Sequence, residues 1–237
     1  PRKIYLLDRT MKRVGKNSLK IVHKAITSEE EKAFLTVFDP ILSRRRYQGN
    51  HWDDVIIKYK EIELHNSQIP SICESTLERL KHDICKYCNV NNDCFLPPHV
   101  IDLDKDGYIA PHIDSIKFSG DFICGLSLGS TRTMALILDE EQYEITLNTY
   151  KDSTSDQFPI EIPQKCHLKG LSYPVDSNEY TIKNLPKKVL FQLPPCSMYI
   201  LQGVWRYAYS HAIIGEQSDI ETTLKNNSDF DRRVSII

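Results

Sequence analysis

The sequence predicts an α+β domain in which N-terminal helices pack outside a β barrel or sandwich. Two observations support this. Apolar residues recur at three- and four-residue steps as far as about Tyr87, which is typical of amphipathic helices. After Pro97 the chain consists of short runs rich in Ile, Leu, Val, Phe and Tyr, separated by Gly, Pro, Asp or Ser, which is typical of strands. Helices followed by strands favour an α+β architecture.

Two helices are expected in the first half of the chain. The first is predicted to begin with a capping box formed by Ser28 and Glu31 and to bend at Pro40. The second is predicted from about Pro70, a residue favoured in a first helical turn, to about Tyr87. Its expected apolar face consists of Cys73, Leu77, Leu80 and Ile84.

Strands are expected over residues 100–103, 122–128, 133–138, 189–193, 198–201, 206–214 and 234–237. Residues 139–190 hold four prolines and separate two of these strands. A connection of this length is unusual in a compact domain, so we interpret it as an insertion, either a lid or an ordinary surface insertion. Alternating polar and apolar residues predict a hairpin over 142–150.

The charge is distributed unevenly along the 237 residues, whose formal net charge is −2. Residues 1–20 carry seven basic side chains and one acid, hence +6, and the 23 basic and 31 acidic residues that remain give −8. We therefore divide the chain into a basic arm, residues 1–20, and a single domain, residues 21–237. The arm fits part of an organelle-import segment or a solvated basic arm. The overall charge does not favour a dedicated duplex binder. No apolar run approaches the roughly 18 residues of a membrane span.

The seven cysteines do not suggest a secreted disulfide framework, because their number is odd and they are widely spread. A reduced compartment is expected. One dense group, His82, Cys85, Cys88 and Cys94, contains a Cys-x2-Cys step and could form a zinc site. The alternative is that its cysteines lie beside the apolar face of the second helix as small hydrophobic residues.

Two His-x-Asp pairs, His51-Trp-Asp53 and His112-Ile-Asp114, are candidate metal ligands. On a strand, this spacing places both side chains on one face. A second histidine from a distant strand would complete the two-histidine, one-carboxylate set that binds non-haem Fe(II). His112 and Asp114 fall at the start of the strand-rich half, and His211 lies on a later strand. Arg233, on the last predicted strand, could bind a dicarboxylic acid through its guanidinium.

Three strings resemble the AlkB-family 2-oxoglutarate dioxygenases, in particular the branch called homologue seven. They are HVIDLDKDGYIAPHIDSIKFSGDFICGLSLGS from residue 99, SMYILQGVWRYAYSHAII from residue 197, and RRRYQGNHWDDVI from residue 44. The resemblance covers most of residues 20–237 and fails in 139–190. It implies a double-stranded β-helix, a jelly-roll or cupin-like barrel, that uses Fe(II), 2-oxoglutarate and dioxygen. It also assigns site residues: His112, Asp114 and His211 as catalytic iron ligands, Tyr199 and Arg233 as contacts to 2-oxoglutarate.

The third string contains Arg44, Tyr47, His51 and Trp52, which the resemblance places in a branch-typical segment outside the metal triad. His51-x-Asp53 is therefore expected not to bind the metal. Two further sets of residues have open roles. The first set has small side chains that either leave space beside the iron or serve sheet packing, and consists of Gly125, Ser127 and Gly129. The second is Arg206, which orients the site, pairs with a carboxylate or is a half-exposed charge.

The chain departs from the nucleic-acid repair members of the family. Ile101 and Leu103 stand where those members have an Asn-x-Tyr pair, and Ile116 stands where they often have a base-reading acid. The family's second arginine would fall at position 239, beyond Ile237. The homologue-seven branch also resembles this chain in lacking the nucleotide-recognition lid.

These features predict an Fe(II)- and 2-oxoglutarate-dependent dioxygenase of the mitochondrial matrix that acts on a protein or another substrate, but not on duplex DNA. One alternative is an oxidative demethylase of single-stranded RNA or DNA whose phosphates contact the +6 arm. Another is a non-catalytic module that binds iron and 2-oxoglutarate and docks a partner through residues 139–190.

Overall fold

The computed structural model describes residues 17–64, 69, 71–115, 119–151, 160–161, 185–215 and 231–237. The strands are β1 (Asn17–Val22), β2 (Gln48–Asn50), β3 (Ile56–Glu63), β4 (His99–His112), β5 (Phe122–Gly129), β6 (Arg132–Leu138), β7 (Ile160–Glu161), β8 (Lys188–Leu193), β9 (Ser197–Gln202), β10 (Tyr209–Ile213) and β11 (Arg233–Ile236). The helices are α2 (Ser28–Leu42), α3 (Ser71–Cys88), α5 (Glu140–Lys151), α6 (Val204–Tyr207) and a 3-10 turn, Asn92–Cys94.

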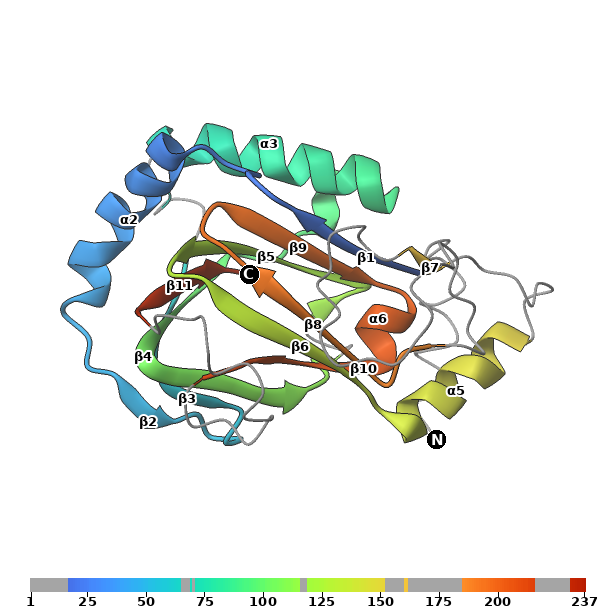
Figure 1. The fold of residues 1–237 in the computed structure, drawn as a ribbon. Helices are drawn as coiled ribbons and strands as arrows, with labels where there is room; N and C mark the ends of the chain where they lie inside the picture. Colours follow the sequence, from blue (N-terminus) through green and yellow to red (C-terminus); the bar gives the residue numbers. More distant parts are fainter. Residues whose placement is uncertain are drawn as a thin grey trace.

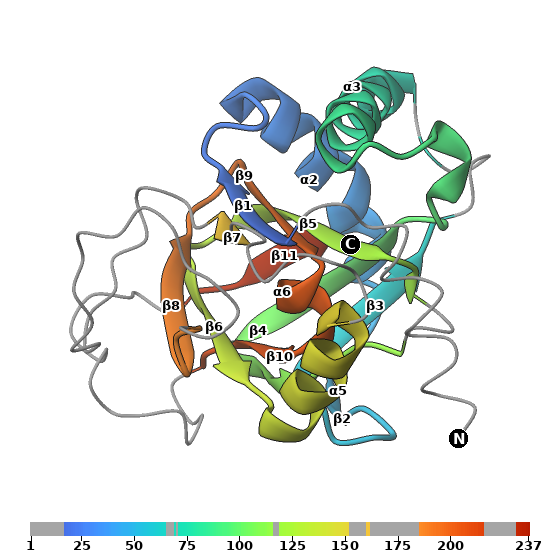
Figure 2. The ribbon, with the colours of Figure 1, turned by 90° about the vertical axis from the view of Figure 1, so that its right-hand side faces the viewer.

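The strands form an antiparallel barrel-like sheet in the order β1-β9-β5-β11-β4-β10-β6-β8, with β7 parallel to β1 and β3 beside β4. Strand β4 links the two halves. Its start, Val100–Leu103, pairs with β11, and its end, at Ile109 and His112, pairs with β10. Figures 1 and 2 show the sheet curling around β4 so that its two halves face each other. This is the double-stranded β-helix, and the predicted fold class is confirmed.

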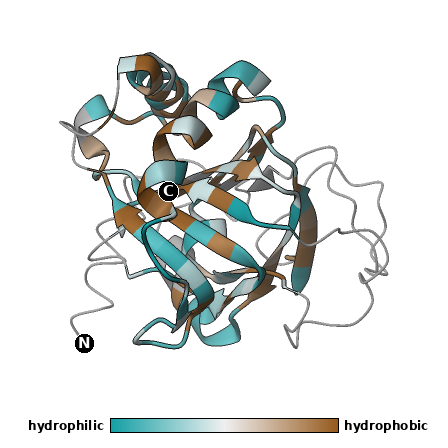
Figure 3. Ribbon diagram, turned by 90° about the vertical axis from the view of Figure 1, so that its left-hand side faces the viewer, coloured by the Kyte–Doolittle hydropathy of each residue, from teal (hydrophilic) through white to brown (hydrophobic). Residues whose placement is uncertain are grey.

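Helices α2 and α3 cover the outside of the half-barrel formed by β1, β9 and β5 (Figures 1 and 2). The predicted apolar face of α3 is confirmed, because Cys73, Leu77, Leu80 and Ile84 are buried. Apolar side chains of the two helices share one core cluster with strand residues such as Ile200 and Val234. In Figure 3, polar and apolar stretches follow one another along helices and strands alike. Within the described residues, no helix has the length and apolar character that crossing a membrane requires.

The capping box of α2 lies one residue earlier than predicted. Thr27, in an extended conformation, is the N-cap and Glu30, rather than Glu31, closes the box. The Glu30 backbone nitrogen donates to Thr27 Oγ1 at 3.1 Å, and the Thr27 nitrogen donates to Glu30 Oε2 at 2.8 Å. Pro40 lies inside α2, as predicted.

Three further predictions differ from the structure. Residues 142–150 belong to α5 and not to a hairpin, because Asp139 Oδ1 accepts from the Gln142 nitrogen and starts a helix. The strand predicted over 206–214 is shorter in the structure. Its first two residues belong to helix α6, which follows Gly203 at a φ of 63°, and the extended part is β10. Strands β1, β2, β3 and β7 were not predicted, and β1 includes residues 17–20 of the proposed basic arm. Residues 1–16 and most of 152–184 lie outside the described residues.

We predict that Glu30→Gln destabilises the protein by about 1 kcal/mol at neutral pH, because the amide oxygen can still accept from the Thr27 nitrogen but the negative charge that pairs with Arg79 in the first helical turn is lost. Burial opposes ionisation of Glu30, but the Thr27 backbone, Arg79 and Thr76 outweigh it and lower its pKa to about 2. Arg79 Nη2 lies 2.8 Å from Glu30 Oε1. Because the folded pKa is depressed, this stabilisation is present above about pH 4.5 and is lost as the pH falls toward 2.

Urea unfolding at neutral pH and at about pH 3 measures this effect. The difference between parent and Glu30→Gln should shrink at the lower pH. Glu29→Gln, in the same helical turn, is the matched control and should have a smaller effect. Equal losses of stability in the two variants would contradict the role given to Glu30.

Candidate metal centre

The structure brings the three predicted metal ligands together at one end of the barrel. One potential ligand atom from each of His112, Asp114 and His211 lies within 4.8 Å of the others. His112 and His211 are direct neighbours across the antiparallel pair β4 and β10, with ring centroids 4.2 Å apart. Asp114 lies two residues beyond the end of β4, so it reaches the site from the connection that follows the strand and not from the strand itself.

The side chains of the triad are oriented for a cation. His112 Nδ1 is 2.9 Å from the Ala110 carbonyl oxygen, so it serves as the donor and Nε2 is directed to Asp114 Oδ1, 3.1 Å away. His211 Nε2 lies 3.8 Å from Asp114 Oδ2. A backbone contact to one histidine nitrogen fixes the tautomer and the ring orientation of metal-binding histidines.

The electrostatics of the three groups also suit a cation. Burial, reinforced by His112, lowers the pKa of His211 to about 3, so its imidazole is neutral at physiological pH. Burial opposes ionisation of Asp114, but His112 and His211 outweigh it and hold the pKa of Asp114 at about 2. Two imidazoles and one carboxylate form a ligand set suited to Fe(II) with open coordination positions.

Arg206 positions the connection that carries Asp114. It is buried in α6, and its Nη1 donates to the backbone carbonyl oxygen of Asp114 at 3.0 Å. Of the roles considered from sequence, the structure supports orientation of the site, and the half-exposed charge is wrong. The arginine therefore fixes the backbone of a proposed ligand from outside the metal position.

The triad faces a cavity of about 250 Å³, here called the inner cavity. Arg233 and Tyr199, the predicted contacts to 2-oxoglutarate, also line it, and both are buried. Arg233 Nε donates to Ser127 Oγ at 3.1 Å. Gly125 makes room for Tyr199, because a Cβ atom there would lie 2.4 Å from the tyrosine ring. The predicted slim strand β5 thus serves these two side chains.

The inner cavity has the features of an anion site. Arg233 is 1% exposed and forms no ion pair within the described part of the chain. Burial lowers its pKa to about 10, so the guanidinium stays charged at neutral pH. Ser235 Oγ, on the same strand, is also buried and lacks a hydrogen-bond partner among the described residues. A dicarboxylate fits here because one of its carboxylates would pair with the Arg233 guanidinium. A buried charge without such a partner lowers the stability of the protein. Ser235 was missed in the sequence, although its two-residue spacing from Arg233 places both on one face of β11.

The second His-x-Asp pair lies at the same cavity but outside the triad. His51 Nδ1 is 2.6 Å from Asp53 Oδ1, and both residues line the inner cavity. The two residues pair with each other. The possible zinc group of His82, Cys85, Cys88 and Cys94 does not assemble in the structure. Cys88 is buried, Cys94 is exposed, and the triad is the only set of three potential ligands within reach of one ion among the described residues. Ile116 and residues 1–16 lie outside the described residues.

Comparison with known proteins identifies two relatives. The chain is 30% identical over 199 residues to "Alpha-ketoglutarate-dependent dioxygenase alkB homolog 7, mitochondrial" of Mus musculus, covering 83% of this chain and 68% of that protein. It is 29% identical over 192 residues to the Bos taurus protein of the same name, and this match covers 81% of this chain and 65% of that protein. The chain thus spans about two thirds of the length of these relatives. No protein-family model matches.

Solved structures align over most of the chain at low similarity. A 2OG-Fe(II) oxygenase family oxidoreductase from Burkholderia pseudomallei has a TM-score of 0.47 and 12% identity, covering 98% of this chain and 87% of that chain. A prolyl-4-hydroxylase from Pseudomonas putida has a TM-score of 0.45 and 8% identity, covering 98% and 95%. These values are too low to support any functional inference.

The fold and the relatives define an enzyme class, the 2-oxoglutarate-dependent oxygenases. Within this class, the chain belongs to the AlkB family of alpha-ketoglutarate-dependent dioxygenases. Fe(II), 2-oxoglutarate and dioxygen are therefore its cofactor and co-substrates, as predicted. The names of both relatives bear out the predicted mitochondrial location. Placement in the matrix stays a prediction.

Proposed function

We propose that this chain acts in the mitochondrial matrix on a protein or another substrate other than duplex DNA. In this proposal His112, Asp114 and His211 hold Fe(II), and Arg233 and Tyr199 hold 2-oxoglutarate. The observation that supports it best is the shared inner cavity, which has a compact His-Asp-His cluster and a buried arginine without an ion pair among the described residues.

Each side chain has a separate task in this mechanism. Bound Fe(II) would supply the redox chemistry by which dioxygen oxidises a substrate C–H bond, coupled to conversion of 2-oxoglutarate to succinate and CO2. His211 offers a neutral nitrogen, and His112 offers Nε2 because its Nδ1 contacts Ala110. Arg206 keeps the Asp114 backbone in place. Arg233 pairs with a carboxylate of 2-oxoglutarate, as guanidinium groups do in a two-bond geometry.

Two features of the inner cavity support a substrate other than duplex DNA. Ile101 lines it, where the family resemblance predicts an asparagine in the nucleic-acid repair members. Arg233 is the only lysine or arginine among its described lining residues, and it lies buried beside Ser127. Phosphate contacts normally need several accessible basic side chains.

The test is turnover in mitochondrial extract with Fe(II), 2-oxoglutarate and oxygen, comparing the parent protein with His211→Ala. Succinate formation is measured, and mass spectrometry searches peptides and RNA for one added oxygen atom or a lost methyl group. We expect oxidised or demethylated peptides with the parent only. Modified RNA would favour the demethylase alternative, and succinate at the His211→Ala level would favour the non-catalytic module.

A further inference from the structure

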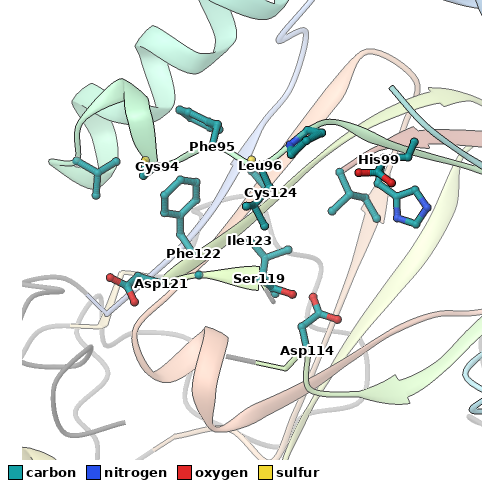
Figure 4. Close-up of a pocket in the computed structure, with 15 residues that line it drawn as sticks. Cys94, Phe95, Leu96, His99, Asp114, Ser119, Asp121, Phe122, Ile123 and Cys124 are labelled. Carbon is teal, nitrogen blue, oxygen red and sulfur yellow. The ribbon is translucent and has the colours of Figure 1, made fainter. Parts of the chain in front are cut away.

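A second cavity continues outward from the metal centre. Its volume is about 570 Å³, within the range of small-molecule and peptide side-chain sites. It shares five lining residues with the inner cavity, so the two are contiguous at the proposed ligand Asp114. The five are His99, Asp114, Ser119, Ile123 and Ile237. Figure 4 shows Ser119 and Ile123 between Asp114 and two phenylalanines, Phe95 and Phe122. We call this cavity the Phe95–Phe122 cleft.

One part of the wall of the cleft is apolar. Phe95 and Phe122 pack edge to face, with ring centroids 5.5 Å apart. Leu96, which also lines the cleft, is 61% exposed and adds apolar surface that a ligand could cover. None of these three side chains has a role in holding iron or 2-oxoglutarate. Their surface is suited to an apolar side chain or to the aliphatic stem of a long charged one.

Carboxylates are the charged side chains that line the cleft among the described residues, apart from the histidine His99. Glu63 and Asp121 line the cleft, and Asp53 and Glu61 line the neighbouring inner cavity. Asp53 faces His51, and His99 Nε2 lies 3.1 Å from Glu61. Apart from Arg233, neither cavity has a lysine or arginine among its described lining residues. A substrate that occupies these cavities therefore lies beside carboxylates, which attract cations and repel phosphates.

We propose that the Phe95–Phe122 cleft binds a peptide segment that carries a lysine or arginine next to the apolar residue presented to the metal. The carboxylates of Glu63 and Asp121 attract the cationic head group into the cleft. Phe95 and Phe122 contact the aliphatic stem or the neighbouring apolar side chain, and a cation can also interact with the ring faces. This inference rests on the proposed function of the metal centre, and it names the substrate class of that site.

Binding can be measured without turnover on the full chain, loaded with Fe(II) and 2-oxoglutarate in the absence of oxygen. Three short fluorescein-labelled peptides share a central leucine and differ in its flanking residues, which are lysine, glutamine or glutamate. A labelled single-stranded RNA is the fourth probe. Fluorescence anisotropy should show the lysine peptide binding about tenfold more tightly than the glutamate peptide, with a difference that shrinks as salt is added.

Replacing the cleft carboxylates by amides of the same shape tests whether the peptide binds in the cleft. Glu63→Gln and Asp121→Asn should each weaken the lysine peptide about two- to fivefold, and the double variant about tenfold. Asp121→Asn keeps an oxygen for the Tyr207 hydroxyl, which lies 3.3 Å away, so folding should be preserved. Leu96→Gln should weaken all three peptides alike. Glu144→Gln, on the exposed side of α5, removes the same charge away from the cleft and should change nothing.

Two outcomes would overturn the inference. One is equal affinity for the lysine and glutamate peptides, and the other is RNA binding more tightly than the lysine peptide. Fe(II) and 2-oxoglutarate binding are titrated in the same samples. If the parent protein binds Fe(II) and 2-oxoglutarate but does not distinguish the peptides, only the substrate class is rejected. If the parent protein does not bind Fe(II), the proposed metal centre itself is rejected.

Discussion

Asp114→Ala is expected to weaken Fe(II) binding by more than about 100-fold, because changes to groups that only support a metal ligand already cost 10–100-fold. The variant leaves two imidazoles and removes the only carboxylate of the triad. Anaerobic titration with Fe(II) measures the loss directly, without a known substrate. Turnover of 2-oxoglutarate to succinate should fall to background in the same variant.

The chain provides a matched control for this prediction in its other His-x-Asp pair. Asp53→Ala makes the same change at the same inner cavity, but Asp53 faces His51 instead of the triad. Fe(II) affinity should stay within a few-fold of the parent. The assignment is wrong if Asp53→Ala loses iron while Asp114→Ala retains it.

The second large effect is expected for Arg233→Gln and concerns 2-oxoglutarate. Removing one partner of a buried charge pair costs about 2–5 kcal/mol, which is roughly a 30- to 5000-fold increase in the dissociation constant for 2-oxoglutarate. Fe(II) affinity without 2-oxoglutarate should change little, because Arg233 is not among the three potential metal ligands. Calorimetric titration of the anaerobic Fe(II) protein with 2-oxoglutarate separates the two affinities.

The neighbouring arginine distinguishes a specific contact from a general loss of positive charge. Arg232 donates to Asp102 at 2.9 Å and to Asp39 at 2.8 Å, so it ties β4 to α2 instead of lining the inner cavity. Arg232→Gln should therefore lower stability and leave 2-oxoglutarate affinity near that of the parent. Unchanged 2-oxoglutarate affinity in Arg233→Gln would exclude Arg233 as the carboxylate-binding residue.

Local patterns predicted the fold where periodicity was regular and failed where it was interrupted. Helix α3 followed from the spacing of its apolar residues, which form one buried face. Most of the later strands followed from short apolar runs between turn residues, and β9, for example, is buried along its whole length. Strand β3 was missed because its register against β4 shifts between Ile57 and Tyr59, and Lys58 between them has a φ of 50°. Such a bulge breaks the two-residue alternation that identifies a strand.

Helix α5 shows a different reason for failure. The alternating residues around Tyr143 and Ile145 fit a strand as well as a helix. Both side chains pack against the barrel core, and the Asp139 cap selects the helix. Short segments of this kind have no strong local preference, so tertiary contacts decide their conformation.

By itself, the sequence determined the fold class, the family, and which His-x-Asp pair and arginine to examine, because these depend on residue identity and order along the chain. Only the tertiary structure decided what surrounds them. It buried Arg206 against the Asp114 carbonyl and joined an apolar cleft with an acidic rim to the metal centre. Such contacts join residues far apart in the chain, and no local spacing encodes them.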